Sequence, residues 1–267
     1  IMSASHWFSK SYLDSRKRFL TSINELSDLG YKVKTDHLLI EAKGSDEEEL
    51  TIDIAVVGSL ESEKMLISSS GVHGVEGYPG SAIQLSIIDE MKKTIMFADV
   101  CIIFIHSINP YGMSWLRRVN ENNVDLNRNF LEKHRWEPEG YKFIDKFVNA
   151  PGLPKKFDPT FYIQGIQLLV KYGFTNIKQW FAQGQYTRPK SLQYGGDKLQ
   201  EGPSLILEWL KKNLHKSKKV FAIDLHTGLG PSGFDTILIP ENISDEKYKL
   251  LISLFNGHVT SLDPVKG

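Results

Sequence analysis

Short apolar runs separated by polar turns divide the chain into predicted helices and strands. Residues 8–29 carry apolar side chains at roughly helical spacing, and Gly30 follows as a plausible stop. The segment PGSAIQLSIIDEMKK predicts a helix with Ile83, Ile87, Ile88 and Met91 on one face. Six further apolar runs have the length of β-strands: HLLIEA, TIDIAVVG, KMLISSS, DVCIIFIHS, VFAIDLH and DTILIPE.

The order of these elements predicts the fold class. The helix PGSAIQLSIIDEMKK lies between two strand-like runs, and strand–helix–strand units usually pair their strands in parallel. We therefore predict one α/β domain over residues 1–267, with a central mixed, mostly parallel sheet and helices on both faces. Residues 131–200 are rich in Gly, Pro, Lys and aromatic residues, with helical pieces near 139–149 and 164–182. We expect this stretch to be an elaboration on the sheet.

Composition excludes some classes of partner. Lys plus Arg and Asp plus Glu both total 32, so the formal net charge is zero and no global field favours nucleic acid or an anionic membrane. The single cysteine, Cys101, lies in an apolar run and is expected to be a buried thiol. No apolar signal-peptide core or membrane-spanning stretch is visible, which favours a cytoplasmic location. The oligomeric state is not predicted.

Two motifs place metal-binding side chains at the ends of predicted strands. His73 and Glu76 follow the run KMLISSS among several glycines, and His226 ends the run VFAIDLH. Ligands of open α/β sheets bind outside the carboxyl ends of the strands. Together the motifs supply His, Glu and His, the three-ligand set of catalytic zinc sites. Asp224 shares a strand face with His226 and could orient its ring. The alternative for each motif alone is an ordinary polar loop.

A third motif, INPYGMSWLRRVNENNVDLNRNF, also opens at the end of a predicted strand. It contains Arg117, Arg118 and Arg128, with Asn127 beside the last of them. The planar guanidinium of arginine binds carboxylates through paired hydrogen bonds. A terminal carboxylate is therefore a natural guest for Asn127 and Arg128, whereas the alternative is a solvated polar loop.

The three motifs HGVEG, NVDLNRNF and DLHTG, in this order, resemble the zinc carboxypeptidase superfamily, which includes the aspartoacylase and succinylglutamate desuccinylase enzymes. The chain is most similar to a bacterial branch of carboxypeptidase-like proteins, on the segments GVHGVEG, NPYG, NVDLNRNF, GQYTRPKSLQYGG and DLHTGLG. This resemblance spans about residues 8–240.

The resemblance implies a role for each matching residue. One zinc ion would be bound by His73, Glu76 and His226, and Asp125 would accept a hydrogen bond from the His73 ring. Asn127 and Arg128 would hold a substrate carboxylate. Arg118 or Arg117 would stabilise the oxyanion that develops on the attacked carbonyl. We prefer Arg118 because it lies nearer the DLNRNF motif.

The chain departs from the family pattern in its general base, a glutamate on a late strand after the last histidine ligand. The late carboxylates Asp235, Glu241, Asp245, Glu246 and Asp263 stand in no matching context. The base is therefore expected either beyond residue 267, with an incomplete C-terminal part, or not at all.

These observations leave several functions open. The leading prediction is a metallopeptidase that cleaves an amide or peptide bond next to a free carboxylate, with a small peptide as substrate. The alternatives are a deacylase of N-acyl amino acids with the same metal centre, and a non-catalytic relative that binds metal or carboxylate without the base.

Overall fold

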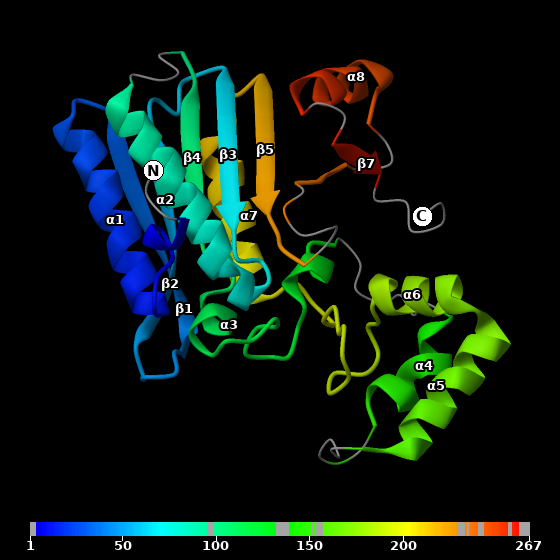
Figure 1. Cartoon of the computed structure of the whole chain (residues 1–267). Coiled ribbons are helices and arrows are strands. Elements are labelled where there is room, and N and C mark those ends of the chain that lie inside the picture. Colours follow the sequence, from blue (N-terminus) through cyan, green and yellow to red (C-terminus); the bar gives the residue numbers. More distant parts are fainter. Residues whose placement is uncertain are drawn as a thin grey trace. The chain divides into compact units, whose positions relative to one another are not determined.

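The computed structural model describes most of the chain, shown in Figure 1. The residues that the structure describes are 4–94, 99–131, 139–150, 152, 157–228, 233, 235–239, 243–255 and 258–261. Within these ranges the chain forms two compact units. The first comprises Ile1–Glu137 and Gly184–His226, and the second comprises Pro138–Gln183 and Thr227–Gly267.

The first unit is built on a five-stranded mixed sheet with strand order β1-β2-β4-β3-β5. Its strands are β1 (Val33–Lys43), β2 (Glu49–Val57), β3 (Lys64–Ser70), β4 (Cys101–His106) and β5 (Lys219–Leu225). Strand β4 is buried along its whole length, and its apolar run CIIFI suits a central strand that is covered on both faces.

Strand direction follows from the connections. The short turn between β1 and β2 permits only antiparallel pairing, and β2 also pairs with β4 antiparallel. The crossover through helix α2 makes β3 and β4 parallel, and β3 pairs with β5 in parallel as well. The predicted mixed α/β sheet is thus confirmed. Only half of its four pairings are parallel, however, so the expectation of a mostly parallel sheet was too strong.

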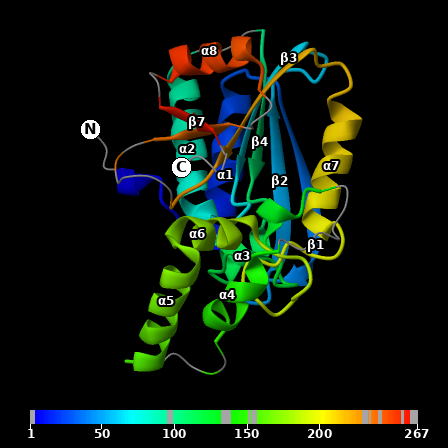
Figure 2. The same cartoon turned by 90° about the vertical axis from the view of Figure 1, so that its right-hand side faces the viewer.

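Helices cover both faces of this sheet. α1 (Tyr12–Asp28) and α2 (Gly77–Lys93) lie on one face, and α7 (Glu201–Asn213) lies on the other (Figures 1 and 2). The Ser11 side chain caps α1 by accepting a hydrogen bond from the Asp14 amide at 3.2 Å. The unit also contains the short helices η1 (Ala4–His6), η2 (Gly74–Glu76), α3 (Pro110–Ser114) and η3 (Leu126–Arg128).

The inner face of α2 differs from the sequence prediction. Ile88 and Met91 are buried as expected, but Ile83 and Ile87 are exposed. The buried stripe instead runs through Ala82 and Leu85 to Ile88 and Met91, at spacings of three residues. The helix α7 was not predicted, although Ile206 and Trp209 on its inner face are spaced one turn apart.

The second unit is described by itself. It contains the helices α4 (Tyr141–Val148), α5 (Pro159–Tyr172) and α6 (Phe174–Gln183), then β6 (Ile237–Ile239), α8 (Asp245–Leu254) and β7 (Val259–Ser261). Aromatic contacts join its first helices; Phe147 and Phe161 stack with ring centroids 4.5 Å apart. The part of the predicted elaboration from 184 to 200 belongs to the first unit, and the single-domain organisation stays a prediction.

Among the described residues, no helix is long and apolar enough to cross a membrane. Cys101 is buried in β4 and burial raises its thiol pKa to about 11, so it has the character expected of an inert core residue.

Candidate metal centre

The parallel pairing of β3 with β5 brings two of the sequence motifs together. Ser70, the last residue of β3, is paired with Leu225, the last residue of β5. His73 and Glu76 follow the first strand and His226 follows the second, so all three side chains emerge at the same edge of the sheet. This is the carboxyl edge at which ligands of open α/β sheets bind.

The turn that follows β3 depends on glycine. Gly71 has φ +69°, a left-handed conformation that favours glycine, and a Cβ there would lie 3.2 Å from the backbone of Ser107. Beyond it, the amides of Gly74 and Val75 donate to the carbonyls of Arg118 and Arg117, at 3.1 and 3.0 Å. The loop that carries His73 and Glu76 is therefore fixed against the arginine-containing loop that follows β4.

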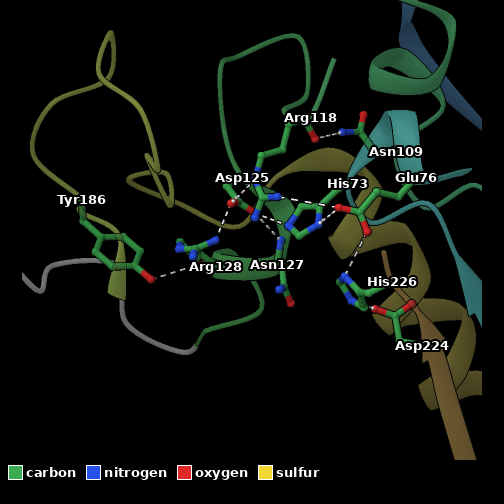
Figure 3. Close-up of polar contacts among 10 residues, drawn as sticks. All are labelled: His73, Glu76, Asn109, Arg118, Asp125, Asn127, Arg128, Tyr186, Asp224 and His226. Atoms are coloured by element: carbon green, nitrogen blue, oxygen red, sulfur yellow. Dashed lines mark hydrogen bonds and ion pairs between the residues drawn. The ribbon is translucent and has the colours of Figure 1, made fainter. Parts of the chain in front are cut away.

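The side chains of His73, Glu76 and His226 form one cluster, in which one potential ligand atom from each lies within 4.8 Å of the others. In Figure 3 both imidazoles face the Glu76 carboxylate. The Nδ1 atom of His73 lies 2.9 Å from Oε1, and the Nδ1 atom of His226 lies 3.5 Å from Oε2. This donor set, two imidazole nitrogens and a carboxylate around one point, fits a catalytic zinc ion.

The opposite nitrogen of each ring contacts a second carboxylate. Nε2 of His73 lies 3.2 Å from Asp125 Oδ1, and Nε2 of His226 lies 2.6 Å from Asp224 Oδ2. Ser69 donates to the other oxygen of Asp224 at 2.7 Å. These carboxylates favour a proton on Nε2, which leaves the Nδ1 lone pairs for a metal.

Asp125 is the most highly coordinated carboxylate of the centre. It is fully buried and accepts hydrogen bonds from Arg118 Nε at 3.1 Å, from a terminal nitrogen of Arg128 and from the Asn127 amide at 3.0 Å, in addition to its His73 contact. Burial alone would raise the Asp125 pKa. The hydrogen bond from His73 and the charges of Arg128 and Arg118 outweigh burial, and they hold the pKa well below its usual range.

The pKa values of His73 and His226 are also shifted from their ordinary values. Hydrogen bonds to Asp224 and Glu76 raise the His226 pKa to about 9 against the effect of burial. Burial would lower the His73 pKa, but its hydrogen bonds to Asp125 and Glu76 outweigh burial and raise it. A cluster of carboxylates that favours cationic imidazoles is a site of negative potential, which suits a divalent cation.

The three arginines of the third motif differ from one another in exposure and in partners. The side chain of Arg118 is 43% exposed and contacts both Asp125 and Glu76, with Nη1 3.7 Å from the Glu76 carboxylate. Arg117 is exposed and donates to Asn123 at 3.5 Å instead. Arg128 is only 15% exposed and reaches the cluster through Asp125. Asn127 is exposed, and its backbone amide donates to Asp125 Oδ1.

In the part of the chain that the structure describes, no carboxylate beside the cluster is positioned as a general base. Among the described residues around it, Asp224 lies behind the His226 ring, on the Nε2 side, and Asp125 lies behind the His73 ring. Glu76 itself belongs to the ligand set. Of the late carboxylates considered from the sequence, Glu241 and Asp263 lie outside the described residues, and Asp235, Asp245 and Glu246 belong to the second unit.

One contact of the centre was not predicted. The Tyr186 hydroxyl donates to the backbone carbonyl of Arg128 at 2.9 Å (Figure 3). The segment GQYTRPKSLQYGG contributed to the family resemblance, but nothing in its residue pattern indicates that it packs on the DLNRNF motif.

The fold of the chain is similar to that of solved structures. It is similar to bovine thrombin-activatable fibrinolysis inhibitor in complex with tick carboxypeptidase inhibitor, with a TM-score of 0.53 and 14% identity over 94% of this chain and 70% of that chain. A second structure of thrombin-activatable fibrinolysis inhibitor has a TM-score of 0.54 and 14% identity, over 95% of this chain and 56% of that chain. The chain thus spans little more than half of the latter protein.

The sequence comparison gives the family. Residues 8–266 match the family described as "Protein of unknown function (DUF2817)", and the chain belongs to it. No curated protein matches the chain. An aspartoacylase family protein from Mesorhizobium loti is 28% identical over 37% of this chain and 30% of its own, with a TM-score of 0.28. The two structures of thrombin-activatable fibrinolysis inhibitor support the fold alone.

Proposed function

We propose that the protein is a zinc-dependent hydrolase that cleaves an amide or peptide bond next to a free carboxylate. The observation that carries this proposal is the joint arrangement of His73, Glu76 and His226 with two arginines bound to Asp125. Zinc, when bound, would polarise the carbonyl of the scissile bond and lower the pKa of a water molecule towards ~7.

The residues of the chain have separable tasks in this proposal. Asp125 and Asp224 hold the two imidazoles with Nδ1 directed at the metal position. Arg118, which is 43% exposed beside Glu76, would stabilise negative charge that develops on the attacked carbonyl oxygen. Arg128, with Asn127 beside it, would bind the substrate carboxylate. Small peptides and N-acyl amino acids both contain the required group, so a deacylase would use the same centre.

One observation supports a second candidate, a non-catalytic protein that binds metal and carboxylate. The carboxylates described around the cluster each hold a histidine or belong to the ligand set, and none faces the metal position as a free base. Hydrolysis by the isolated chain separates the two candidates. Turnover of short peptides or N-acyl amino acids that depends on zinc supports the hydrolase.

Binding tests the centre without requiring turnover. We would load the protein with zinc, measure metal content, and titrate 3-mercaptopropionate and its uncharged analogue 3-mercaptopropanamide calorimetrically. A thiolate binds zinc in both cases, so the carboxylate is the only difference. We expect one zinc per chain and tighter binding of the carboxylate. Arg128→Lys should reduce this preference, whereas Arg117→Lys, which points to Asn123, should keep it. Equal affinities for both thiols in the unmodified protein would contradict the carboxylate site.

A further inference from the structure

The segment Gly184–Gln200, which we call the clasp, packs against the motif that contains Asp125 and Arg128. The Asp125 amide donates to the Tyr194 carbonyl at 2.7 Å. At the other end of the motif, the Asn129 side chain donates to the carbonyls of Gly195 and Lys198, each at 2.9 Å. The clasp therefore holds the motif on both sides of Arg128.

The clasp maintains its own shape through a buried glutamine. Gln185 is fully buried, and its Oε1 accepts hydrogen bonds from the amides of Thr187 and Arg188 at 3.1 and 2.7 Å. Its Nε2 donates to the Arg188 carbonyl at 2.8 Å. Gly195 completes the turn by donating to the Gln185 carbonyl at 2.9 Å. Buried hydrogen bonds of this kind make the segment a rigid support rather than a loose loop.

Two clasp residues contact Arg128 directly. The Tyr186 hydroxyl donates to its backbone carbonyl at 2.9 Å, and Tyr186 is itself buried. Gly184 lies against its side chain, where an added Cβ would be 2.4 Å from Arg128 Cδ and 2.6 Å from Nε. The guanidinium donates to the Asp125 carboxylate. Tyr186 thus contacts the backbone of Arg128, Gly184 lies against the stem of its side chain, and Asp125 binds its charged group.

We propose that Tyr186 and Gly184 are positioning residues that fix the Arg128 guanidinium in the orientation in which it receives a substrate carboxylate. This inference rests on the proposed function, because it assumes that Arg128 binds that carboxylate. A free arginine side chain loses considerable rotamer freedom when it binds a ligand, and an arginine held in place beforehand loses less. The clasp would therefore increase affinity for carboxylates in particular, without contacting the metal ligands.

Tyr186→Phe tests the inference, because it removes the hydroxyl and keeps the ring. With zinc-loaded protein, we expect the affinity for 3-mercaptopropionate to fall about five- to tenfold, a typical consequence of releasing one long side chain. The affinity for 3-mercaptopropanamide and the zinc content should stay unchanged. Tyr31→Phe is the matched control, since its hydroxyl also donates to a backbone carbonyl, that of Met91 at 2.8 Å, away from the centre.

Gly184→Ala provides a second variant that displaces the side chain instead of the backbone. Gly184 has φ +75°, so circular dichroism and zinc content must first match those of the unmodified protein. The same selective loss of carboxylate affinity is expected. An unchanged preference in Tyr186→Phe would overturn the inference and leave the proposed function intact, as would equal loss for both thiols. If the unmodified protein itself binds both thiols equally, the carboxylate site fails, and the inference fails with it.

Discussion

At the scale of single residues, Asp125 joins the two halves of the candidate centre. One buried carboxylate contacts the candidate metal ligand His73 and two arginines, so a change there should affect both the candidate metal centre and the arginines. The sequence indicated His73 and Arg128 through motifs that open after predicted strands, and it indicated Asp125 through the resemblance to the zinc carboxypeptidase superfamily. It could not identify Tyr186, whose contact with Arg128 joins residues far apart in the chain and depends on how the clasp folds.

The first prediction concerns Asp125→Asn. The variant keeps the shape of the side chain but leaves Arg128 buried without its carboxylate, so unfolding free energy should fall by about 3–5 kcal/mol. Zinc affinity should fall about 10–100-fold because His73 loses its fixed acceptor. Urea unfolding and chelator competition measure the two effects. Asp224→Asn is the control: its carboxylate is 36% exposed, so it should weaken zinc binding with a smaller loss of stability. Equal losses of stability in Asp125→Asn and Asp224→Asn would show that the buried contacts of Asp125 with the arginines contribute nothing in particular to folding.

The second prediction concerns His106, a fully buried residue on the α1 side of the sheet. Its Nε2 atom lies 2.9 Å from the Ser15 hydroxyl and its ring stacks on Phe19. Burial lowers its pKa from 6.5 to about 4. The unfolded chain then binds the proton more readily, so stability is retained above pH 6.5 and lost as the pH falls towards 4. The loss should reach about 3 kcal/mol.

Urea unfolding between pH 7 and pH 4, with EDTA present, measures this loss. His106→Gln cannot titrate in this range and should show a correspondingly flatter dependence on pH. The two proteins share all other titrating groups, so their difference isolates His106. If the unfolding free energies of the two proteins depended on pH in the same way, His106 would not be a buried neutral histidine with a lowered pKa.

At the scale of elements, the unit β3–α2–β4 followed directly from sequence periodicity, because apolar runs flank an amphipathic helix. The helix α7 was not predicted although its apolar residues have helical spacing, because Gly202 and Pro203 in its first turn are residues typical of loops. The burial of α2 was misjudged because Ile83 and Ile87 are apolar without facing the sheet. Apolar side chains are often exposed, so composition alone does not define the inner face.

A prediction at this scale concerns the contact of Gly74, in the loop that carries His73 and Glu76, with α3. A Cβ on Gly74 would lie 2.1 Å from the Gly112 carbonyl carbon and 2.4 Å from the Met113 amide nitrogen. Gly74→Ala should therefore separate the two segments, lowering stability by about 1–3 kcal/mol and weakening zinc binding. Gly30→Ala is the control, because Gly30 has φ +91° and nothing within 4 Å. It should cost about 1 kcal/mol from backbone strain and leave zinc affinity unchanged. Normal zinc affinity in Gly74→Ala would show that this close contact does not position the ligands.

At the scale of the whole molecule, the sequence predicted the sheet of the first unit and the cluster of His73, Glu76 and His226 at its edge, and metal binding by this cluster stays a prediction. The division into two units was not predicted, because residues 131–200 change composition without a clear boundary. The general base could not be located, since a base is recognised by its position opposite the metal and not by its residue type.

The last prediction links the metal to the stability of the first unit. His73 and Glu76 follow β3 and His226 follows β5, so a bound ion would join two separate loops of the folded state. A ligand present at about a thousandfold over its dissociation constant adds about 4 kcal/mol to folding. For a unit of this size that corresponds to roughly 10 °C in melting temperature. EDTA should therefore lower the melting temperature of zinc-loaded protein by about this amount. His226→Ala, which removes an exposed ligand and leaves the core intact, should melt at the same temperature with or without EDTA. Scanning calorimetry of both proteins decides the matter. An EDTA response that survives in His226→Ala would place the stabilising metal elsewhere in the chain.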